Sequence, residues 1–332
     1  MKVLVTGGTG YIGSHTCVEL IKSGHTVEIL DNLSNSKEES LDKIEKITGT
    51  RPKFHKVDLK DYEKTLEVFE SENFEAVIHF AGLKAVGESV EKPLEYYENN
   101  VGGAINLLRA MRETGVKKLI FSSSATVYGD QGAKAYSEEM TTGVGITNPY
   151  GWTKSMIEQI IRDFSRAQKD FSATILRYFN PIGADKSGFL GEDPNGIPNN
   201  LMPVVMKVYR GEIPELTIFG DDYETEDGSC RRDFIHVTDL AKGHIAALEN
   251  MENGTKVYNL GSGKPTSVFE VISLFEKISG EKLPVRIGKR RAGDLSEFWA
   301  NPELAKKELG WETELDVEDA IRDTLNYLKN LS

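Results

Sequence analysis

The feature that most constrains the fold is a glycine-rich turn close to Met1. A short apolar run, Lys2 to Thr6, leads directly into Gly7-x-x-Gly10-x-x-Gly13, and a helical pattern follows over residues 12–23. Glycines at these places allow a sharp turn after a strand, close approach of the backbone to a pyrophosphate, and tight packing of the next helix. A simple tight turn could use the same residues, but here a strand precedes it and a helix follows. We therefore expect a dinucleotide to place its phosphates at the start of this helix.

The first half of the chain alternates short β-branched runs with helical patterns. We expect strands at residues 2–6, 26–30, 53–57, 76–80, 118–122 and 173–178, and helices at 12–23, at 93–114 and from Pro149 onward. This alternation is typical of βαβ units and a parallel sheet. The predicted fold class is therefore α/β, a Rossmann-type doubly wound parallel sheet with a second, smaller α/β substrate domain.

The amino-acid composition of the chain changes after residue 180. Residues 181–203 are rich in Gly, Pro and Asn, which indicates long irregular connections. A helical pattern at 239–248 and a strand pattern at 257–260 suggest that the chain then returns to the first sheet. We predict a dinucleotide-binding domain over 1–180, with a return at about 236–261, and a substrate-binding domain over 181–332, ending in an amphipathic helix at 317–328.

Composition excludes several classes of protein. A chain of 332 residues that is 39% hydrophobic and 28% charged is ordinary for a globular protein of two domains. A net charge of −12 without a long basic run argues against nucleic acid or an anionic membrane as partner. The opening apolar run is too short for a signal peptide, and no run of 18 apolar residues occurs. Cys17 and Cys230 fit a reducing compartment, and the six histidines show no metal-ligand spacing. We expect a cytoplasmic protein without a disulfide or a metal.

Asp31 lies at the end of the second expected strand. A carboxylate there accepts hydrogen bonds from the adenosine ribose hydroxyls and repels a 2′-phosphate, so it favours NAD over NADP. The alternative is a turn-forming aspartate beside Asn32.

Tyr150 and Lys154 stand four residues apart in the first turns of the helix that begins after Asn148. Asn148 suits the cap position and Pro149 the first helical position. A phenol has a reference pKa of about 10, and a lysine one turn away supplies the cation that favours the phenolate. This is the single Tyr-x-x-x-Lys in a chain with 12 tyrosines, about the number that chance gives. Together with Ser122 to Ser124 at a strand end and the glycine turn, the pair indicates hydride chemistry on a bound dinucleotide.

The longer pattern resembles the extended short-chain dehydrogenase/reductases, and most closely their branch of UDP-glucose 4-epimerases. The motifs that carry the resemblance span most of the chain: Gly7 to His15, Phe80 to Ser89, Phe121 to Asp130, Tyr178 to Pro181 and Arg290 to Asp294. The resemblance implies an NAD-dependent isomerase of galactose metabolism that interconverts UDP-galactose and UDP-glucose. A hydride would leave carbon 4 and return to the opposite face of a transient 4-keto sugar.

The resemblance also implies roles for single residues. Tyr150 is the expected acid/base, with its pKa lowered by Lys154 and the nicotinamide charge; Lys154 holds the nicotinamide ribose, and Ser124 hydrogen-bonds the reacting oxygen. The residues implied to bind the cofactor are Gly7, Gly10, Tyr11, Ile12, Gly13, Asp31, Asn32, Asp58, Leu59, Phe80, Ala81, Lys84, Asn99, Tyr150, Lys154 and Phe179. Considered alone, Asp58 could be a loop aspartate and Lys84 a solvated surface cation.

A nucleotide sugar carries a diphosphate, which calls for arginines on an otherwise acidic protein. Arg231, Arg232 and Arg291 are the candidates, although a surface ion pair is the default for any one arginine. The resemblance selects two of them. The residues implied to bind the substrate are Ser124, Asn180, Asn200, Leu201, Thr217, Phe219, Arg232, Arg291, Asp294 and Phe298.

Two phenylalanines depart from the pattern of the branch. Phe298 occupies a position where well-known bacterial epimerases carry Tyr and those that accept N-acetylated sugars carry a small residue. Its bulky ring should crowd an N-acetyl group, so we expect UDP-glucose and UDP-galactose to be preferred. Phe234 lacks a hydroxyl where a Tyr can occur, which leaves one substrate contact in doubt.

Three other functions share this fold. A nucleotide-sugar 4,6-dehydratase usually carries Asp-Glu after the catalytic Ser or Thr, whereas Ala125 and Thr126 follow Ser124 here. A catalytically silent NAD-binding regulator usually loses the tyrosine or the lysine, and both are present. A dehydrogenase that releases NADH is separated from an epimerase by the resemblance alone. The family commonly forms homodimers through the helix that carries Tyr150 and the long helix before it, so we expect a homodimer.

Overall fold

A seven-stranded sheet is the centre of the larger part of the protein, whose computed structural model describes residues 1–193, 198, 200–291 and 293–331. Its order is β11-β7-β5-β4-β1-β2-β3, and each neighbouring pair is parallel. The order reverses between β1 and β4, which is where ligands bind in folds of this kind. The bounds are β1 (Lys2–Thr6), β2 (Thr26–Asp31), β3 (Lys53–Lys56), β4 (Ala76–His79), β5 (Lys118–Ser124), β7 (Ser172–Tyr178) and β11 (Gly254–Leu260).

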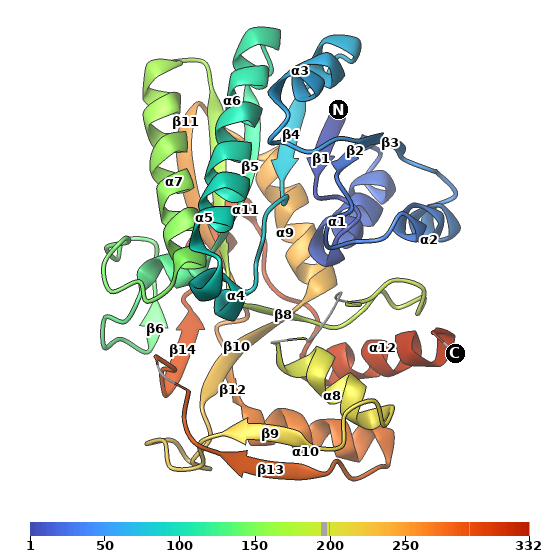
Figure 1. Ribbon diagram of the computed structural model, residues 1–332, viewed down its shortest axis with the longest axis vertical. Coiled ribbons are helices and arrows are strands. Elements are labelled where there is room, and N and C mark those ends of the chain that lie inside the picture. Colours follow the sequence, from blue (N-terminus) through green and yellow to red (C-terminus); the bar gives the residue numbers. More distant parts are fainter. Residues whose placement is uncertain (194–197, 199, 292, 332) are drawn as a thin grey trace.

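Helices cover both faces of this sheet because its strands are apolar on both sides (Figure 1). In β1, Val3 and Val5 point into one buried cluster and Leu4 into the other. The first cluster is completed by α1 (Tyr11–Lys22), α2 (Glu39–Thr48) and α9 (Val237–Glu249), and the second by α3 (Tyr62–Ser71), α6 (Gly103–Thr114) and α7 (Pro149–Ala167). The predicted Rossmann-type α/β fold is confirmed.

The helix expected over residues 93–114 contains a change of winding. It consists of α5 (Pro93–Tyr96), a π-helical segment η1 (Tyr97–Gly102) and α6, and it follows the short α4 (Val86–Glu91). The hydrophobic spacing does not distinguish a π turn from an α turn. Such turns are frequent at functional sites, and this one holds Asn99, a predicted cofactor residue.

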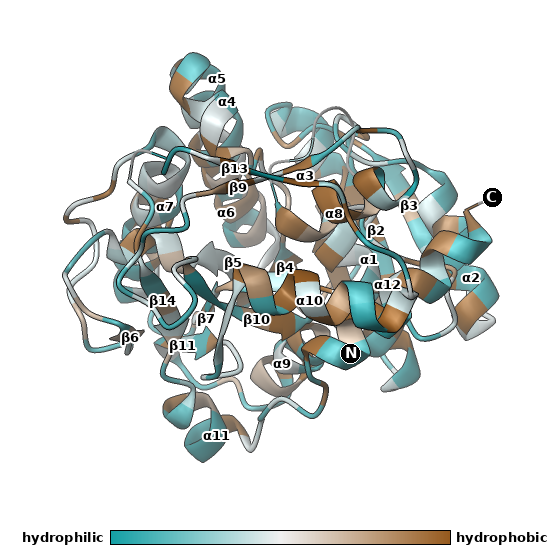
Figure 2. Cartoon of the chain, turned by 90° about the horizontal axis from the view of Figure 1, so that it is seen from below, coloured by the Kyte–Doolittle hydropathy of each residue, from teal (hydrophilic) through white to brown (hydrophobic). Residues whose placement is uncertain are grey.

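The second part of the protein is built around β10 (Arg231–His236). Three more strands align with it in the order β12-β10-β14-β6, and β8 also pairs with β10. The bounds are β6 (Ala135–Tyr136), β8 (Asn180–Ile182), β12 (Pro265–Ser267) and β14 (Glu297–Ala300), with β9 (Leu216–Phe219) and β13 (Val285–Gly288) as a separate pair. The helices of this part are α8 (Leu201–Tyr209), α10 (Val268–Ser279) and α12 (Val317–Asn330), whereas α11 (Glu303–Leu309) packs beside β11 of the large sheet. In Figure 2, α10 and α12 alternate hydrophobic and hydrophilic segments, as amphipathic helices do. The predicted division into domains at residue 180 stays a prediction.

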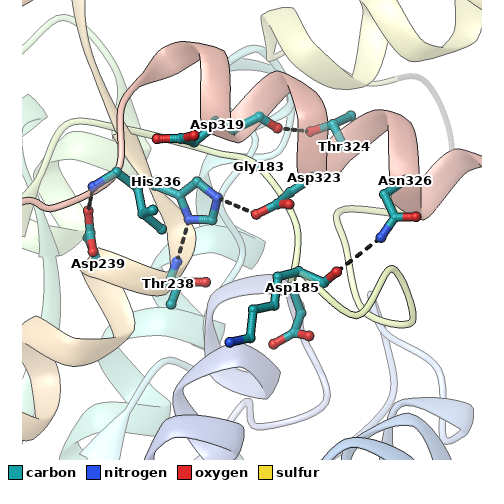
Figure 3. Close-up of polar contacts among 12 residues, drawn as sticks. Gly183, Asp185, His236, Thr238, Asp239, Asp319, Asp323, Thr324 and Asn326 are labelled. Atoms are coloured by element: carbon teal, nitrogen blue, oxygen red, sulfur yellow. Dashed lines mark hydrogen bonds and ion pairs between the residues drawn. The ribbon is translucent and has the colours of Figure 1, made fainter.

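Polar contacts attach α12 to the rest of the protein (Figure 3). The Thr238 amide donates to His236 Nδ1 at 3.1 Å, so the ring proton sits on Nε2, which faces Asp323 Oδ2 at 3.2 Å. The Asn326 side chain donates to the Lys186 carbonyl at 3.0 Å. The predicted terminal helix is confirmed, and it binds both the end of β10 and the loop after β8. In the part of the chain that the structure describes, no helix has the length and apolar character needed to cross a bilayer.

Candidate active site

The glycine turn between β1 and α1 is too crowded for side chains. Gly7 has a φ of +71°, and a Cβ on it would lie 2.6 Å from the Ala81 nitrogen. A Cβ on Gly13 would lie 2.3 Å from the Gly7 carbonyl oxygen. Gly10 is the N-cap of α1, and no side chain among the described residues caps that helix. Its amino terminus therefore faces outward with the positive end of the helix dipole available for an anion.

Asp31 lies beside this turn at the end of β2. It is 8% exposed, and its carboxylate accepts from the Thr9 amide at 3.3 Å and from the Leu33 amide at 2.9 Å. The Asn32 side chain donates to Asp58 Oδ2 at 3.1 Å. Three predicted cofactor residues are thus together at the carboxyl ends of β2 and β3. The glycine cradle, the uncapped helix and the buried carboxylate fit the diphosphate and adenosine ribose of a dinucleotide.

The remaining predicted cofactor residues lie on α1, on η1 and on the loops around this turn. The Tyr11 hydroxyl donates to the Gly183 carbonyl at 2.7 Å, and Lys84 Nζ lies 3.2 Å from Glu192 Oε1. Ala81 closes over Gly7, and the neighbouring Phe80 ring packs 4.8 Å from the His244 ring. Ile12 packs against the first buried cluster, Leu59 lies in the second, and Asn99 donates to Asn100.

The loop after β8 contributes a residue that the sequence analysis missed. Glu192 is 7% exposed and lies in a stretch interpreted only as irregular connection. It meets Lys84, and Lys37 meets the adjacent Asp193 at 2.6 Å. Lys37, Lys84, Glu192 and Asp193 are visible in the sequence as charged residues, but their pairing depends on the fold.

The structure brings Ser124, Tyr150 and Lys154 together at the carboxyl end of β5. Asn148 caps α7 as predicted, because its side chain accepts from the Gly151 amide at 2.8 Å. Lys154 is 6% exposed, donates from Nζ to the Ser122 carbonyl at 2.6 Å, and lies 5.9 Å from the Tyr150 ring centroid. The Ser124 hydroxyl accepts from the Thr126 amide at 3.3 Å, and its polar interaction with Tyr150 lowers the pKa of the phenol. A phenol, an ammonium group and a hydroxyl therefore share one partly buried site.

Burial has opposite effects on the two ionisable groups of this site. Burial raises the pKa of the phenol above its ordinary value, and the interaction with Ser124 opposes this only in part. Burial lowers the pKa of Lys154 to about 8, against the negative charge of Glu158. In the protein chain itself, desolvation is the largest influence on the pKa of this phenol. The expectation that Lys154 and the nicotinamide charge together lower the pKa of Tyr150 concerns the site with its dinucleotide and stays a prediction.

Four predicted substrate residues gather at the end of β9 and after β13. Arg291 Nε lies 3.1 Å from Asp294 Oδ2, and its guanidinium lies 4.6 Å from the centroid of the Phe219 ring. Arg232 Nη2 is 3.7 Å from the other Asp294 oxygen. Arg231 instead faces Glu297 at 3.5 Å, so it is separated from this group. Ala292, within the motif that carries Arg291, lies outside the described residues.

Phe298 is placed between predicted cofactor and substrate residues. It pairs with Arg232 in the register of β14 and β10, and its ring lies 5.1 Å from that of Phe179 and 4.5 Å from that of Tyr136. Phe234 is different, because it is buried in the apolar core under β10.

The other predicted substrate residues lie on β8, on α8 and on β9. Asn180 begins β8, and Asn200 and Leu201 stand at the start of α8. The Thr217 hydroxyl accepts from Arg286 at 2.9 Å. Among the described residues, no three His, Cys, Asp or Glu side chains are arranged to hold a metal ion.

Comparison with known proteins adds independent information. Residues 3–261 match the NAD dependent epimerase/dehydratase family. A UDP-glucose 4-epimerase of Bacillus subtilis (strain 168) is 53% identical over 329 residues, which cover 98% of this chain and 96% of the relative. A UDP-glucose 4-epimerase of Erwinia amylovora is 53% identical, with 98% and 97% covered.

A solved structure is similar over the same extent. The UDP-glucose 4-epimerase of Bifidobacterium longum, crystallised with NAD+ and UDP, has a TM-score of 0.96 and 49% identity, and the match covers 99% of this chain and 98% of that one. Sequence and fold thus agree over almost the whole length. The chain belongs to the NAD dependent epimerase/dehydratase family.

Proposed function

We propose that the protein is an NAD-dependent UDP-glucose 4-epimerase that interconverts UDP-galactose and UDP-glucose. The observation that carries the proposal is the convergence of Ser124, Tyr150 and Lys154 at the end of β5, beside a glycine turn shaped for a dinucleotide. Relatives that share half of the sequence over nearly the full chain carry this activity.

The chemistry of the site follows from these three side chains. The Tyr150 phenolate takes the proton of the carbon 4 hydroxyl and later returns it. Ser124, which already interacts with the Tyr150 phenol, holds the same oxygen and orients the transfer. Lys154 places its ammonium beside the phenol, fixed by the Ser122 carbonyl. The glycine turn, Asp31 and Lys84 would hold NAD, which when bound would supply the hydride acceptor and a positive charge that favours the phenolate.

The turn after Ser124 favours epimerisation over dehydration. Elimination of water needs a carboxylic acid beside the sugar, at the positions of Ala125 and Thr126. Ala125 is 2% exposed, and the Thr126 hydroxyl donates to Ser124 at 3.0 Å. Neither residue has a carboxyl group, so the site lacks the acid that would eliminate water after the first hydride transfer.

The substrate side supports a nucleoside diphosphate sugar. Arg232 and Arg291 present two guanidinium groups for the diphosphate, and Asp294 between them is the proposed ribose contact. The Phe219 ring, against Arg291, offers a stacking surface near the base. Phe298 would line the sugar site and crowd an N-acetyl group.

The experiment that tests the proposal uses the purified protein and UDP-galactose without added NAD. Chromatography should show UDP-glucose forming while the absorbance of NADH stays constant. Accumulating NADH would indicate a dehydrogenase. Absence of product even after NAD is supplied would contradict the proposal.

The proposed assembly is a homodimer in the cytoplasm. Leu94 on α5 is 77% exposed, and Val90 on α4, Ile105 on α6 and Met156 on α7 are 61%, 41% and 41% exposed. These helices lie together on one side of the sheet (Figure 1), so a second copy could cover their apolar side chains. The free thiols of Cys17 and Cys230 support a reducing compartment. Light scattering of the Leu94→Glu variant should show monomers if this surface is the interface.

A further inference from the structure

The helix that carries Tyr150 and Lys154 has a third buried polar residue one turn further on. Glu158 is 1% exposed, and its Oε1 accepts from the Ser123 hydroxyl at 2.6 Å. Arg177, equally buried, donates to both carboxylate oxygens, from Nε at 2.9 Å and from Nη2 at 2.6 Å. Burying two charges is costly unless the geometry satisfies them, yet no step of the proposed reaction uses this carboxylate.

The position of Glu158 on α7 gives it a geometric role. Tyr150, Lys154 and Glu158 are spaced by four, so they lie along one face of the helix. Two of them bond consecutive residues of β5: Lys154 donates to the Ser122 carbonyl, and Glu158 accepts from the Ser123 hydroxyl. The next residue of the strand, Ser124, acts on the Tyr150 phenol and lowers its pKa. A slide of the helix along the strand would break both hydrogen bonds and displace Tyr150 from Ser124.

Arg177 extends this arrangement to the turn that follows Ser124. Its Nη1 donates to the Tyr128 hydroxyl at 3.0 Å, and Tyr128 donates to Asn259 Oδ1 at 2.7 Å. Tyr128 ends the 3₁₀ turn η2 (Ala125–Tyr128), which begins directly after Ser124. One guanidinium on β7 therefore holds both the catalytic helix, through Glu158, and the segment that presents the serine.

We propose that Glu158 is a positioning residue which, with Arg177 and Ser123, sets the register of α7 on β5 and so the placement of Tyr150 and Lys154. The inference rests on the proposed function, because it assigns these two residues to catalysis. Glu158 is proposed to touch neither substrate nor cofactor. It acts through Lys154 and Tyr150, which lie one and two turns before it on α7.

The charges around Lys154 give the role a measurable signature. The groups that face Lys154 are Tyr150 and Glu158 on α7 and His79 on β4; Tyr178 on β7 faces Tyr150. His79 is neutral because burial lowers its pKa to about 3. Glu158 is thus the negative charge that raises the pKa of Lys154 against burial. Without that carboxylate, Lys154 should lose its proton at lower pH.

The test compares Glu158→Gln with the double variant Glu158→Gln/Arg177→Met. The single variant leaves Arg177 buried without its partner and should lower the melting temperature, whereas the double variant removes both charges and should recover it. In both, we expect kcat for UDP-galactose to fall by about tenfold or more, since small misplacements are costly, with KM little changed. The alkaline limb of the kcat profile should shift to lower pH.

Two serine variants provide a matched comparison. Ser123→Ala removes one hydrogen bond to Glu158 and should lower kcat without changing KM. Ser165→Ala removes another buried serine of α7. Its hydroxyl donates to the Phe171 carbonyl at 3.5 Å and takes no part in the site, so this variant should retain full activity. The double variant could recover its melting temperature and, with it, the wild-type kcat and pH profile. That result would show a purely structural role and overturn the inference.

A titration separates this inference from the proposed function. Phenolate formation by Tyr150 is followed as the ultraviolet difference between each protein and its Tyr150→Phe counterpart. We expect the midpoint of the Tyr150 titration to lie at higher pH in Glu158→Gln than in the wild type, whether or not the wild-type protein converts UDP-galactose. An unchanged titration would overturn the positioning role, whereas failure of the wild-type protein in the conversion assay would overturn only the proposed function.

Discussion

Lys154 donates a 2.6 Å hydrogen bond from its ammonium group to the backbone carbonyl of Ser122. This bond ties α7 to β5 two residues before Ser124 and fixes the ammonium beside Tyr150. Because this hydrogen bond fixes the lysine side chain to the strand, its ammonium group is held in one position. The site is therefore assembled by the contact between one helix and one strand end.

Tyr150→Phe removes the proposed acid/base and little else. We expect kcat to fall by about 100-fold or more, which is typical for loss of a general acid/base. Initial rates with UDP-galactose and the thermal midpoint measure the effect, and the midpoint should change little. The comparison is Tyr209→Phe, whose ring packs 5.5 Å from that of Phe275 in the second part of the protein. Equal losses in both variants would contradict the role of Tyr150.

Gly13→Ala should abolish retention of NAD. The new Cβ would lie 2.3 Å from the Gly7 carbonyl oxygen, so the turn and the start of α1 must move. Nucleotide released by denaturing the purified variant can be quantified by chromatography. Gly87→Ala is the control, because a Cβ there has no described atom within 4 Å. Normal NAD content in Gly13→Ala would show that the turn does not hold the diphosphate.

Phe298→Ser should widen the sugar site towards N-acetylated substrates. Removing the ring leaves space beside Phe179 and Tyr136, so we expect the ratio of kcat/KM for UDP-N-acetylglucosamine to that for UDP-glucose to rise at least about tenfold, equivalent to about 1.4 kcal/mol. Phe234→Leu, in the core under β10, should leave the ratio unchanged. Comparable turnover of both sugars by the wild-type protein would contradict the crowding argument.

Buried histidines predict a loss of stability in acid. Burial lowers the pKa of His79 to about 3, well below its value in the unfolded chain. The unfolded state binds this proton at higher pH than the folded state, so the stabilisation is complete above pH about 6.5 and lost as pH falls towards about 3. At pH about 4.5 the loss from this ring is about 3 kcal/mol. The free energy of unfolding, measured with urea, should fall more steeply with decreasing pH in the wild type than in His79→Asn over this range. Parallel pH profiles would contradict a buried, neutral His79.

Local patterns predicted much of this structure. The six expected strands are present within a few residues of their predicted ends, and Asn148 caps α7 as its side chain and position indicated. The strands around β10 were not predicted, because β10 begins with the charged residues Arg231, Arg232 and Asp233, and its partners β8, β12 and β14 come from distant parts of the chain. Such pairings leave no periodic pattern in a single segment.

The site was predictable to the same degree. Tyr150, Lys154 and Asp31 follow from spacing on one helix or strand, and the structure places each at the expected end of the sheet. Glu158 has the same spacing after Lys154, which could have drawn attention to it. Its partner Arg177 lies on β7, 19 residues later, and their contact exists only once β7 is inserted beside β5.

In the proposed reaction, one hydrogen leaves carbon 4 and the same hydrogen returns to the other face. Conversion of UDP-galactose carrying deuterium at carbon 4, with mass spectrometry and NMR of the product, tests this. We expect UDP-glucose that retains the deuterium at carbon 4. Loss of the deuterium to solvent would contradict the proposed reaction, because the hydrogen would then have left as a proton rather than as a hydride held within the site.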